Sequence, residues 1–228
     1  MTSTDPRAIR TAYPTRTDSP TRTDSPTRTD SPTRTDSPTR TDSPTRTAEA
    51  VETVRYEVHR LSVATGLAFD ETVRRYEQAV PALDEARFAA LAAGWPTWTE
   101  VRAAILPHAP HDFVRYWRGD FGWLLRAAGD EGRCVEYLMG NHVIAERMFR
   151  HDPGVLLHAP LRTTIHTDHL ARTRFSVDQP STHFRSYGNR SITIVGIELD
   201  LKLATLLESL DFPVPDALTT GRVPAATG

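Results

Sequence analysis

The sequence predicts an α+β domain over residues 51–211, built on a mainly antiparallel sheet. The first observation is a β-hairpin pattern between residues 161 and 177, where apolar and polar residues alternate on both sides of a short turn. The second is an apolar stripe with steps of three and four residues over 192–210, which predicts a long helix. A composition of 39% hydrophobic and 25% charged residues is typical of a globular protein.

The first 50 residues differ in composition from the predicted domain. Residues 15–44 are five consecutive copies of TRTDSP, which contain no aliphatic or aromatic side chain. Such a segment has no apolar surface to offset the entropy of ordering its backbone, so we expect residues 1–50 to be a disordered arm. The recurrent Ser-Pro pairs leave two interpretations open, a tolerated linker and a phosphorylatable or partner-binding arm. At the other end, residues 212–228 have three prolines and no periodicity, which predicts a flexible tail.

The predicted domain begins with a strand and a helix. The segment VRYEVHRLSV at 54–63 alternates loosely between apolar and polar residues and predicts a strand. Asp70 is the predicted N-cap of a helix that continues to about residue 80, where Pro81 ends it.

Two further helices are predicted before the rest of the sheet. The alanine-rich residues 83–93 predict a helix that Gly94 stops. The sequence Thr97-Trp98-Thr99-Glu100 has the spacing of a capping box and predicts a third helix. All four tryptophans lie between residues 95 and 123, where core and edge packing is the simpler explanation and an aromatic ligand pocket or a partner surface is the alternative.

The central part of the chain predicts two strands and a helix. Residues 113–117 and 133–139 have the apolar and β-branched or aromatic content of short strands. Asn141 is the predicted N-cap of a helix over 142–150, and the Asp-Pro-Gly sequence from residue 152 ends it.

The last elements are the hairpin and the long helix. In the hairpin, Arg162 and Arg174 fall on the polar side of the alternation, and we expect them to face one another across the two strands. Asn189 follows a glycine and is the predicted N-cap of the helix that carries the apolar stripe. That stripe is wide enough to suggest burial on more than one side, including a subunit contact.

The sequence YLMGNHVIAERMFRHDPGVLLHAPLRTTIH, followed by RTRFSVDQPS, resembles the domain-of-unknown-function 302 family. The resemblance covers about residues 52–210 and is strongest over 137–210. It implies a compact β-α-β(4)-α fold with helices packed on one face of the sheet, similar to the TATA-binding-protein-like architecture and often dimeric. Helices around 82–106 are an insertion relative to that pattern. The resemblance implies no established reaction.

This chain departs from the family at two places. Many members have a Cys-Asn-Pro turn where this chain has Gly140-Asn141-His142, and a Pro-Cys pair where it has Pro160-Leu161. A redox or metal role that depends on those cysteines therefore does not transfer to this chain. Its single cysteine, Cys134, also excludes an intramolecular disulfide and thiolate metal cages.

His142 and Glu146 are the candidate metal ligands, because residues four apart share one face of a helix. The alternative hypothesis is thus a metal-binding enzyme or sensor, with Tyr137 or His151 completing the ligand set. A metal site also needs further ligands close to these two. On one extended strand His158 and His166 would lie about 26 Å apart, so they could not bind the same ion. Glu146 is also placed to form an ion pair with Arg150. We therefore predict no metal site and no cofactor.

Sequence motifs, net charge and the lengths of apolar runs exclude several classes of function. The sequence contains no G-x-S-x-G elbow, P-loop or G-x-G-x-x-G motif, and we find no catalytic residue. A formal net charge of −2 gives no reason to expect nucleic acid or an anionic membrane as partner. The first 50 residues contain no apolar run typical of a signal peptide, and no stretch approaches the length of a membrane span, so we expect a cytoplasmic protein.

The preferred hypothesis is a non-catalytic module that binds a small anionic ligand or a partner protein. Helix N-termini attract anions, and Asn141 and Asn189 each begin a helix. Arg162 and Arg174 would add positive charge, and His142 and Glu146 would lie beside the first of the two turns. A third hypothesis is a domain that forms a homodimer and displays the repeat arm.

Overall fold

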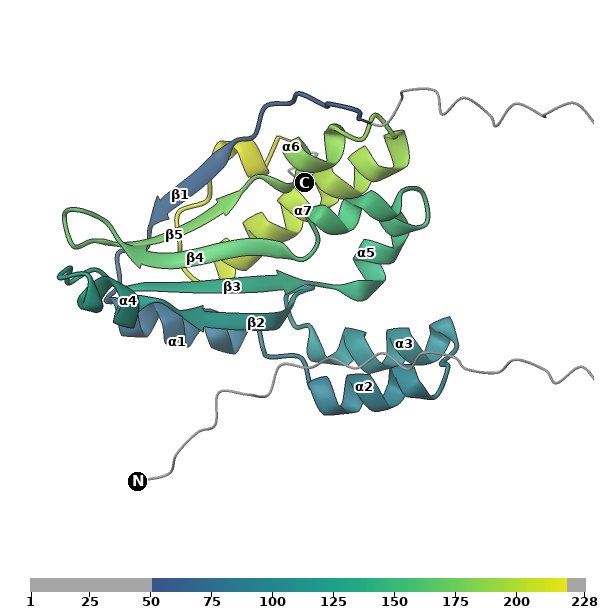
Figure 1. Ribbon diagram of the computed structural model, residues 1–228, viewed down its shortest axis with the longest axis horizontal. Helices are drawn as coiled ribbons and strands as arrows, with labels where there is room; N and C mark the ends of the chain where they lie inside the picture. Colours follow the sequence, from purple (N-terminus) through teal and green to yellow (C-terminus); the bar gives the residue numbers. More distant parts are fainter. Residues whose placement is uncertain (1–50, 221–228) are drawn as a thin grey trace, which may run out of the picture. The chain divides into compact units, whose positions relative to one another are not determined.

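The computed structural model describes residues 51–220, so the predicted arm lies outside the described residues. Its centre is a five-stranded sheet with the order β1-β5-β4-β3-β2, in which every neighbouring pair is antiparallel (Figure 1). The strands are β1 (Arg60–Ala64), β2 (Val114–Asp120), β3 (Cys134–Gly140), β4 (Leu161–Thr167) and β5 (Thr173–Asp178).

Seven α-helices and three short 3-10 helices accompany the sheet in the described part of the chain. The α-helices are α1 (Phe69–Ala79), α2 (Glu85–Ala93), α3 (Trp98–Ile105), α4 (Gly122–Ala127), α5 (His142–Phe149), α6 (Pro180–Arg185) and α7 (Arg190–Ser209). The 3-10 helices are η1 (Leu106–His108), η2 (Pro153–Leu157) and η3 (Asp216–Leu218). The prediction of an α+β fold with an antiparallel sheet is confirmed, and α2 and α3 are inserted between α1 and β2.

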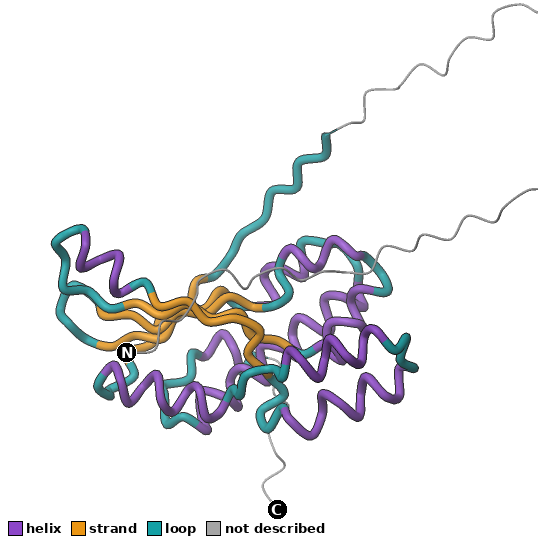
Figure 2. Tube along the Cα trace, turned by 60° about the horizontal axis from the view of Figure 1, so that its bottom comes forward, coloured by secondary structure: helices purple, strands orange, loops and turns teal. Residues whose placement is uncertain are grey.

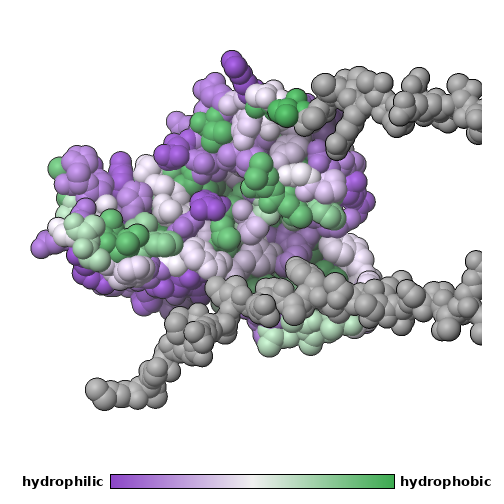
Figure 3. Space-filling model, in the orientation of Figure 1, coloured by the Kyte–Doolittle hydropathy of each residue, from purple (hydrophilic) through white to green (hydrophobic). Residues whose placement is uncertain are grey.

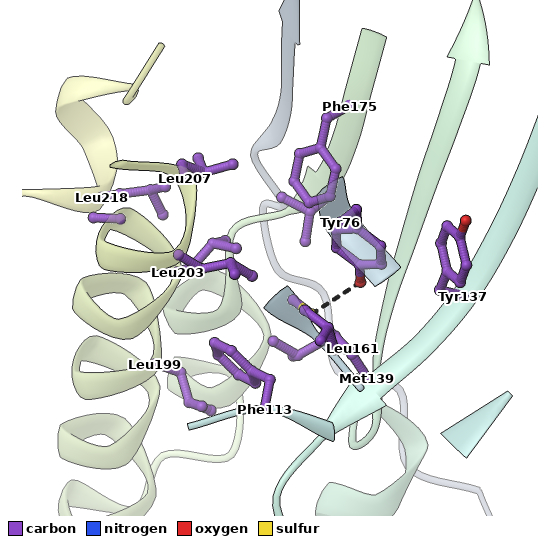
Figure 4. Close-up of a cluster of buried hydrophobic side chains, with 14 of the residues drawn as sticks. Tyr76, Phe113, Tyr137, Met139, Leu161, Phe175, Leu199, Leu203, Leu207 and Leu218 are labelled. Carbon is purple, nitrogen blue, oxygen red and sulfur yellow. Dashed lines mark hydrogen bonds between the residues drawn. The ribbon is translucent and has the colours of Figure 1, made fainter. Parts of the chain in front are cut away.

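The core lies between one face of the sheet and the long helix α7. Figure 4 shows Leu199, Leu203 and Leu207 of α7 on one side of this cluster, with Tyr76 and Phe175 on the other. Each of these five side chains is at most 5% exposed. The helical stripe predicted over 192–210 is confirmed by this packing.

Helix α4 is an exception to the one-sided packing. Figure 2 shows it on the opposite side of the sheet from α1. Its side chains Trp123 and Leu124 are 61% and 50% exposed, and Figure 3 shows a hydrophobic patch among hydrophilic residues at this end of the molecule. The sequence did not predict this helix, because six residues are too few to show a periodic apolar pattern.

The first strand is shorter than the prediction over 54–63. Only Arg60–Ala64 pairs with β5, and residues 54–59 are extended without a strand partner. The reason is the end of the neighbouring strand at Asp178, after which Pro180 begins α6. Gln179 N still donates to the carbonyl of His59 at 2.8 Å, and this is the last backbone link between the two segments.

The predicted N-cap at Asp70 is wrong by two residues. Helix α1 already begins at Phe69, and its N-cap is Ala68, whose side chain cannot accept a hydrogen bond. Phe69 is buried under the guanidinium of Arg133, which lies 4.1 Å from the ring centroid. Asp70 instead accepts two hydrogen bonds from Arg133, at 2.9 and 2.5 Å, from within the first helical turn. Core burial of Phe69 therefore sets the start of this helix.

Other local predictions hold. Gly94 follows the last residue of α2, and Thr97 and Glu100 form both hydrogen bonds of the capping box at the start of α3. In the hairpin, Leu161, Thr163 and Ile165 are buried on the apolar face, as alternation predicts.

The predicted flexible tail begins too early at residue 212. Phe212 and Leu218 are only 4% and 1% exposed and belong to the core cluster. The side-chain amide of Gln179 also donates to the carbonyl of Ala217 at 3.0 Å. These contacts extend the folded domain through η3, while residues 221–228 lie outside the described part.

Gly196 allows α6 and α7 to approach closely, which yields a stability prediction. A Cβ atom at this position would lie 2.9 Å from Cβ of Phe184 and 3.1 Å from Cα of Ser181. Replacing Gly196 with valine should therefore lower the free energy of unfolding by about 1–3 kcal/mol through overpacking. Urea denaturation followed by circular dichroism measures this change. The exposed Ile194→Val on the same helix is the control, and equal midpoints for the two variants would contradict the prediction.

Candidate functional site

The two predicted caps are confirmed, and capping occupies their side chains. Asn141 is 5% exposed; its Oδ1 accepts from Val143 N at 2.9 Å, and its Nδ2 donates to the carbonyl of Asp112 at 3.0 Å. Asn189 Oδ1 accepts from the backbone N–H groups of Ser191 and Ile192. An anion at either turn would have to compete with these internal hydrogen bonds, so the caps alone do not make a binding site.

Arg162 and Arg174 do not face one another, which corrects the prediction for the hairpin. The register of β4 and β5 places His166 opposite Arg174. Arg162 is paired with Glu136 on the neighbouring strand β3, and Arg174 Nε lies 3.7 Å from Asp168 Oδ2. Both guanidinium groups therefore already have carboxylate partners.

His142 and Glu146 share α5 but serve separate contacts. Glu146 forms the predicted ion pair with Arg150. The His142 ring stacks on Phe88 with a centroid distance of 4.4 Å, and its Nδ1 is hydrogen-bonded to the hydroxyl of Tyr116 at 2.8 Å. Burial lowers the pKa of His142, so the neutral imidazole is favoured.

The two residues proposed to complete the metal site, Tyr137 and His151, have other roles in the structure. Tyr137 Oη donates to Glu77 Oε1 at 3.0 Å, and burial raises the pKa of this phenol. His151 follows the end of α5, where a cation is favoured by the helix dipole. Within residues 51–220, no three His, Cys, Asp or Glu side chains are grouped so that they could hold a metal ion.

A pocket of about 370 Å³ is lined in part by Phe88, the residue that stacks on His142. It is bordered by the segment between α1 and α2, the first turns of α2, the end of α3 with η1, and the start of β2. Its lining residues are Pro81, Ala82, Leu83, Asp84, Arg87, Phe88, Ala104, Ile105, Pro107, His108, Pro110 and Val114. Because Phe88 both lines the pocket and stacks on His142, the predicted site residue His142 supports one wall without lining it.

Local sequence explains the walls of this pocket. Pro81 ends α1 and is followed by a short bridge to β2, where Arg115 N donates to Pro81 O at 2.8 Å and Leu83 N donates to Arg115 O at 2.9 Å. Ile105 and Val114 are each 1% exposed and supply apolar surface. Helix α2 has no buried residue, so one side of the pocket is formed by the least buried helix pair of the domain.

The polar side of the pocket contains Asp84, Arg87 and His108. Asp84 Oδ1 accepts from Arg87 N at 2.9 Å and so caps α2. Arg87 Nη1 lies 2.9 Å from His108 Nε2. Because a guanidinium can only donate, this nitrogen of His108 must accept, and the imidazole is neutral in this arrangement.

Arg87 has no carboxylate partner in the described part of the chain, where its guanidinium contacts only the neutral His108. The arginines of β2 differ, because Arg115 and Arg118 both lie within 3.1 Å of Glu77. Arg87 is thus a cation at the edge of the pocket without a direct ion pair, although the Asp84 carboxylate lines the same pocket. No sequence motif connects Arg87 with His108, which belongs to a different helix, so the pair could not be predicted from the sequence.

The tryptophans do not form an aromatic pocket. None of the four lines the cavity, and Trp95 is 86% exposed. Trp117 packs over Gly119 on the open face of the sheet, where an added Cβ at residue 119 would overlap the indole. Trp117 lies on the edge strand β2, as core and edge packing predicts, whereas Trp95 and Trp123 are too exposed to be explained by packing in the core.

Comparisons with known proteins add a structural likeness. Neither the models of protein families nor the curated proteins contain a match to this chain. Among solved structures, the chain is similar to the crystal structure of an uncharacterized conserved protein DUF302 from Bacillus stearothermophilus. The two are 15% identical with a TM-score of 0.46, and the match covers 67% of this chain and 97% of that chain.

The helices of residues 51–220 include none with the length and apolar character needed to cross a membrane.

Proposed function

We propose that the pocket beside α2 binds a small organic anion with an apolar body, and that the protein acts as a non-catalytic ligand-binding module. The observation that carries this proposal is the guanidinium of Arg87, which borders an apolar cavity and has no carboxylate partner within the described residues. A volume of about 370 Å³ lies at the lower end of the range for small-molecule sites, roughly 300–1,000 Å³.

The chemistry of the lining residues defines the ligand class. A carboxylate would accept two parallel hydrogen bonds from N–H groups of Arg87. This arrangement is stronger than the present contact with the neutral imidazole of His108. The apolar body would lie against Phe88, Ile105 and Val114. Asp84 would repel a second negative charge at this rim, so a monocarboxylate is favoured over a dianion.

The test compares matched acids and amides. We expect aromatic and medium-chain aliphatic monocarboxylates to raise the melting temperature of the wild-type protein, whereas their uncharged amides have a much smaller effect. Replacing Arg87 with glutamine should weaken carboxylate binding about 10- to 100-fold, because hydrogen bonds to a charged group contribute about 1.5–3 kcal/mol. Isothermal titration calorimetry measures this change directly.

Two variants make this test specific. Arg102→Gln removes an exposed arginine from α3 that does not line the pocket, and it should leave affinity unchanged. Ala104→Phe places a ring in the cavity and should abolish binding of acids and amides alike. The proposal fails if no monocarboxylate shifts the melting temperature, or if Arg102→Gln weakens binding as much as Arg87→Gln. Either result would favour the interaction-module hypothesis.

A further inference from the structure

Two histidines far from the pocket form a stacked pair. His158 precedes β4 and His183 lies in α6, yet their rings are stacked with a centroid distance of 4.2 Å and an interplanar angle of 19°. Both side chains are partly buried. Nearly parallel rings direct their nitrogen lone pairs in similar directions, so the pair is poorly arranged to hold a common metal ion.

The hydroxyl of Tyr56 is hydrogen-bonded to both imidazoles. It lies 3.2 Å from His158 Nε2 and 3.4 Å from His183 Nδ1, and the phenol ring meets both imidazoles edge-on. Tyr56 belongs to residues 54–59, which are exposed and have no strand partner. The contact with the histidine pair is therefore one attachment of this segment, and the other is His59, whose carbonyl and Nδ1 are hydrogen-bonded to Gln179 at 2.8 and 3.1 Å.

We propose that the His158–His183 pair is a pH-sensitive anchor that holds residues 54–59 at neutral pH and releases them in acid. When both rings are neutral, one can accept the Tyr56 proton while the other donates to the phenol oxygen. When both are protonated, neither nitrogen can accept that proton, and two like charges are stacked 4.2 Å apart. The anchor is independent of the ligand pocket, because it shares no residue with it.

The groups around the histidine pair have different effects on its protonation. Asp178 Oδ2 lies 3.8 Å from His183 Nε2 and favours protonation, but the same carboxylate also accepts from Arg60 Nε at 3.3 Å. Tyr187 contacts the edge of His158 and carries no charge near neutral pH.

The net effect is a lowered pKa for both histidines. Burial lowers the pKa of His158 and of His183 below the ordinary value of 6.5, and the charge of His183 adds to the effect on His158. The stabilisation is therefore fully present above pH 6.5 and is lost as the pH falls through the lowered pKa values.

Side-chain relaxation measured by NMR on the full chain tests the anchor. Methyl order parameters of Val54 and Val58, which flank Tyr56, would be measured at about pH 5 and about pH 7.5. We expect both to fall in acid, because release of Tyr56 frees the segment, whereas those of Val63 in β1 should not change. Equal order parameters of Val54 and Val58 at both pH values would overturn the proposal.

Substitutions separate charge from packing. The double variant with His158→Gln and His183→Asn keeps polar groups near the positions of Nε2 and Nδ1 but cannot become charged, so the order parameters of Val54 and Val58 should be the same at both pH values. In Tyr56→Phe they should be low at both. If the double variant retains the pH dependence of the wild type, the histidines are not the switch. NMR titration of the two ring C–H signals provides a second measurement on the wild-type chain, and pKa values at or above 6.5 for both rings would likewise overturn the proposal.

Discussion

Replacing Tyr76 with alanine should destabilise the domain by about 3–5 kcal/mol, the largest effect that we expect from a single substitution. Tyr76 is fully buried, and its ring lies between Tyr137 and Phe175, with centroid distances of 4.7 and 5.7 Å. Figure 4 shows how centrally it lies between the sheet and α7. Its removal would leave a large cavity that rigid neighbours cannot fill. Urea denaturation measures this loss of free energy of unfolding, provided that the m-value is the same for the variant and the wild type.

The hydroxyl of Tyr76 contributes separately from the ring. It is hydrogen-bonded to Thr163 Oγ1 at 2.9 Å and donates to Met139 Sδ at 3.2 Å. Tyr76→Phe keeps the ring and leaves the buried Thr163 hydroxyl without this partner, so we expect a cost of about 1–3 kcal/mol. Leu157→Ala is the control, because that side chain is 81% exposed. A loss below about 1 kcal/mol for Tyr76→Ala would contradict the packing described for this core.

Replacing Asp200 with alanine should cost about 2–4 kcal/mol, because it leaves two buried donors without an acceptor. Asp200 is 5% exposed and accepts from Gln179 Nε2 at 2.8 Å and from Ser181 N at 2.9 Å. Gln179 also donates a hydrogen bond to the carbonyl of Ala217 in η3. Loss of the Asp200 carboxylate should therefore also loosen η3. Hydrogen exchange at residues 215–220 would detect this loosening, and unchanged protection there would contradict the proposed connection.

The effect of Asp200 should depend on pH. Burial raises the pKa of this carboxyl above its ordinary value of 3.8, which means that the protonated form is favoured in the folded state. Its contribution is therefore fully present below pH 3.8 and is lost as the pH rises through the raised pKa. The stability difference between wild type and Asp200→Ala should accordingly be larger near pH 4 than near pH 7. The reverse order would show that the hydrogen bonds to the ionised form dominate over burial.

Helix and hairpin predictions succeeded where short-range chemistry decides the structure. Asn141 and Asn189 cap α5 and α7 because an Asn side chain reaches backbone N–H groups two or three residues ahead. Alternation over the hairpin identified its buried face, because successive side chains of a strand point to opposite sides. These features depend on neighbours in sequence and are readable from it.

Predictions that needed a distant partner failed or were not made. Arg162 and Arg174 share a face of the hairpin, but the strand register gave them different carboxylates. The predicted tail carries Phe212 and Leu218, and only the surface offered by the core decides that they are buried. The candidate pocket likewise depends on Arg87 meeting His108 across two helices.

The sequence by itself determined the α+β class, the caps and the apolar faces of the long helix and the hairpin. The tertiary structure alone decided which charged groups are neutralised and which are not. The physical reason is that periodicity and capping act over a few residues of backbone, whereas ion pairing requires two side chains to meet after the whole chain has packed. For this reason, Arg87 beside its pocket and Tyr56 on its histidine pair could only be recognised in three dimensions.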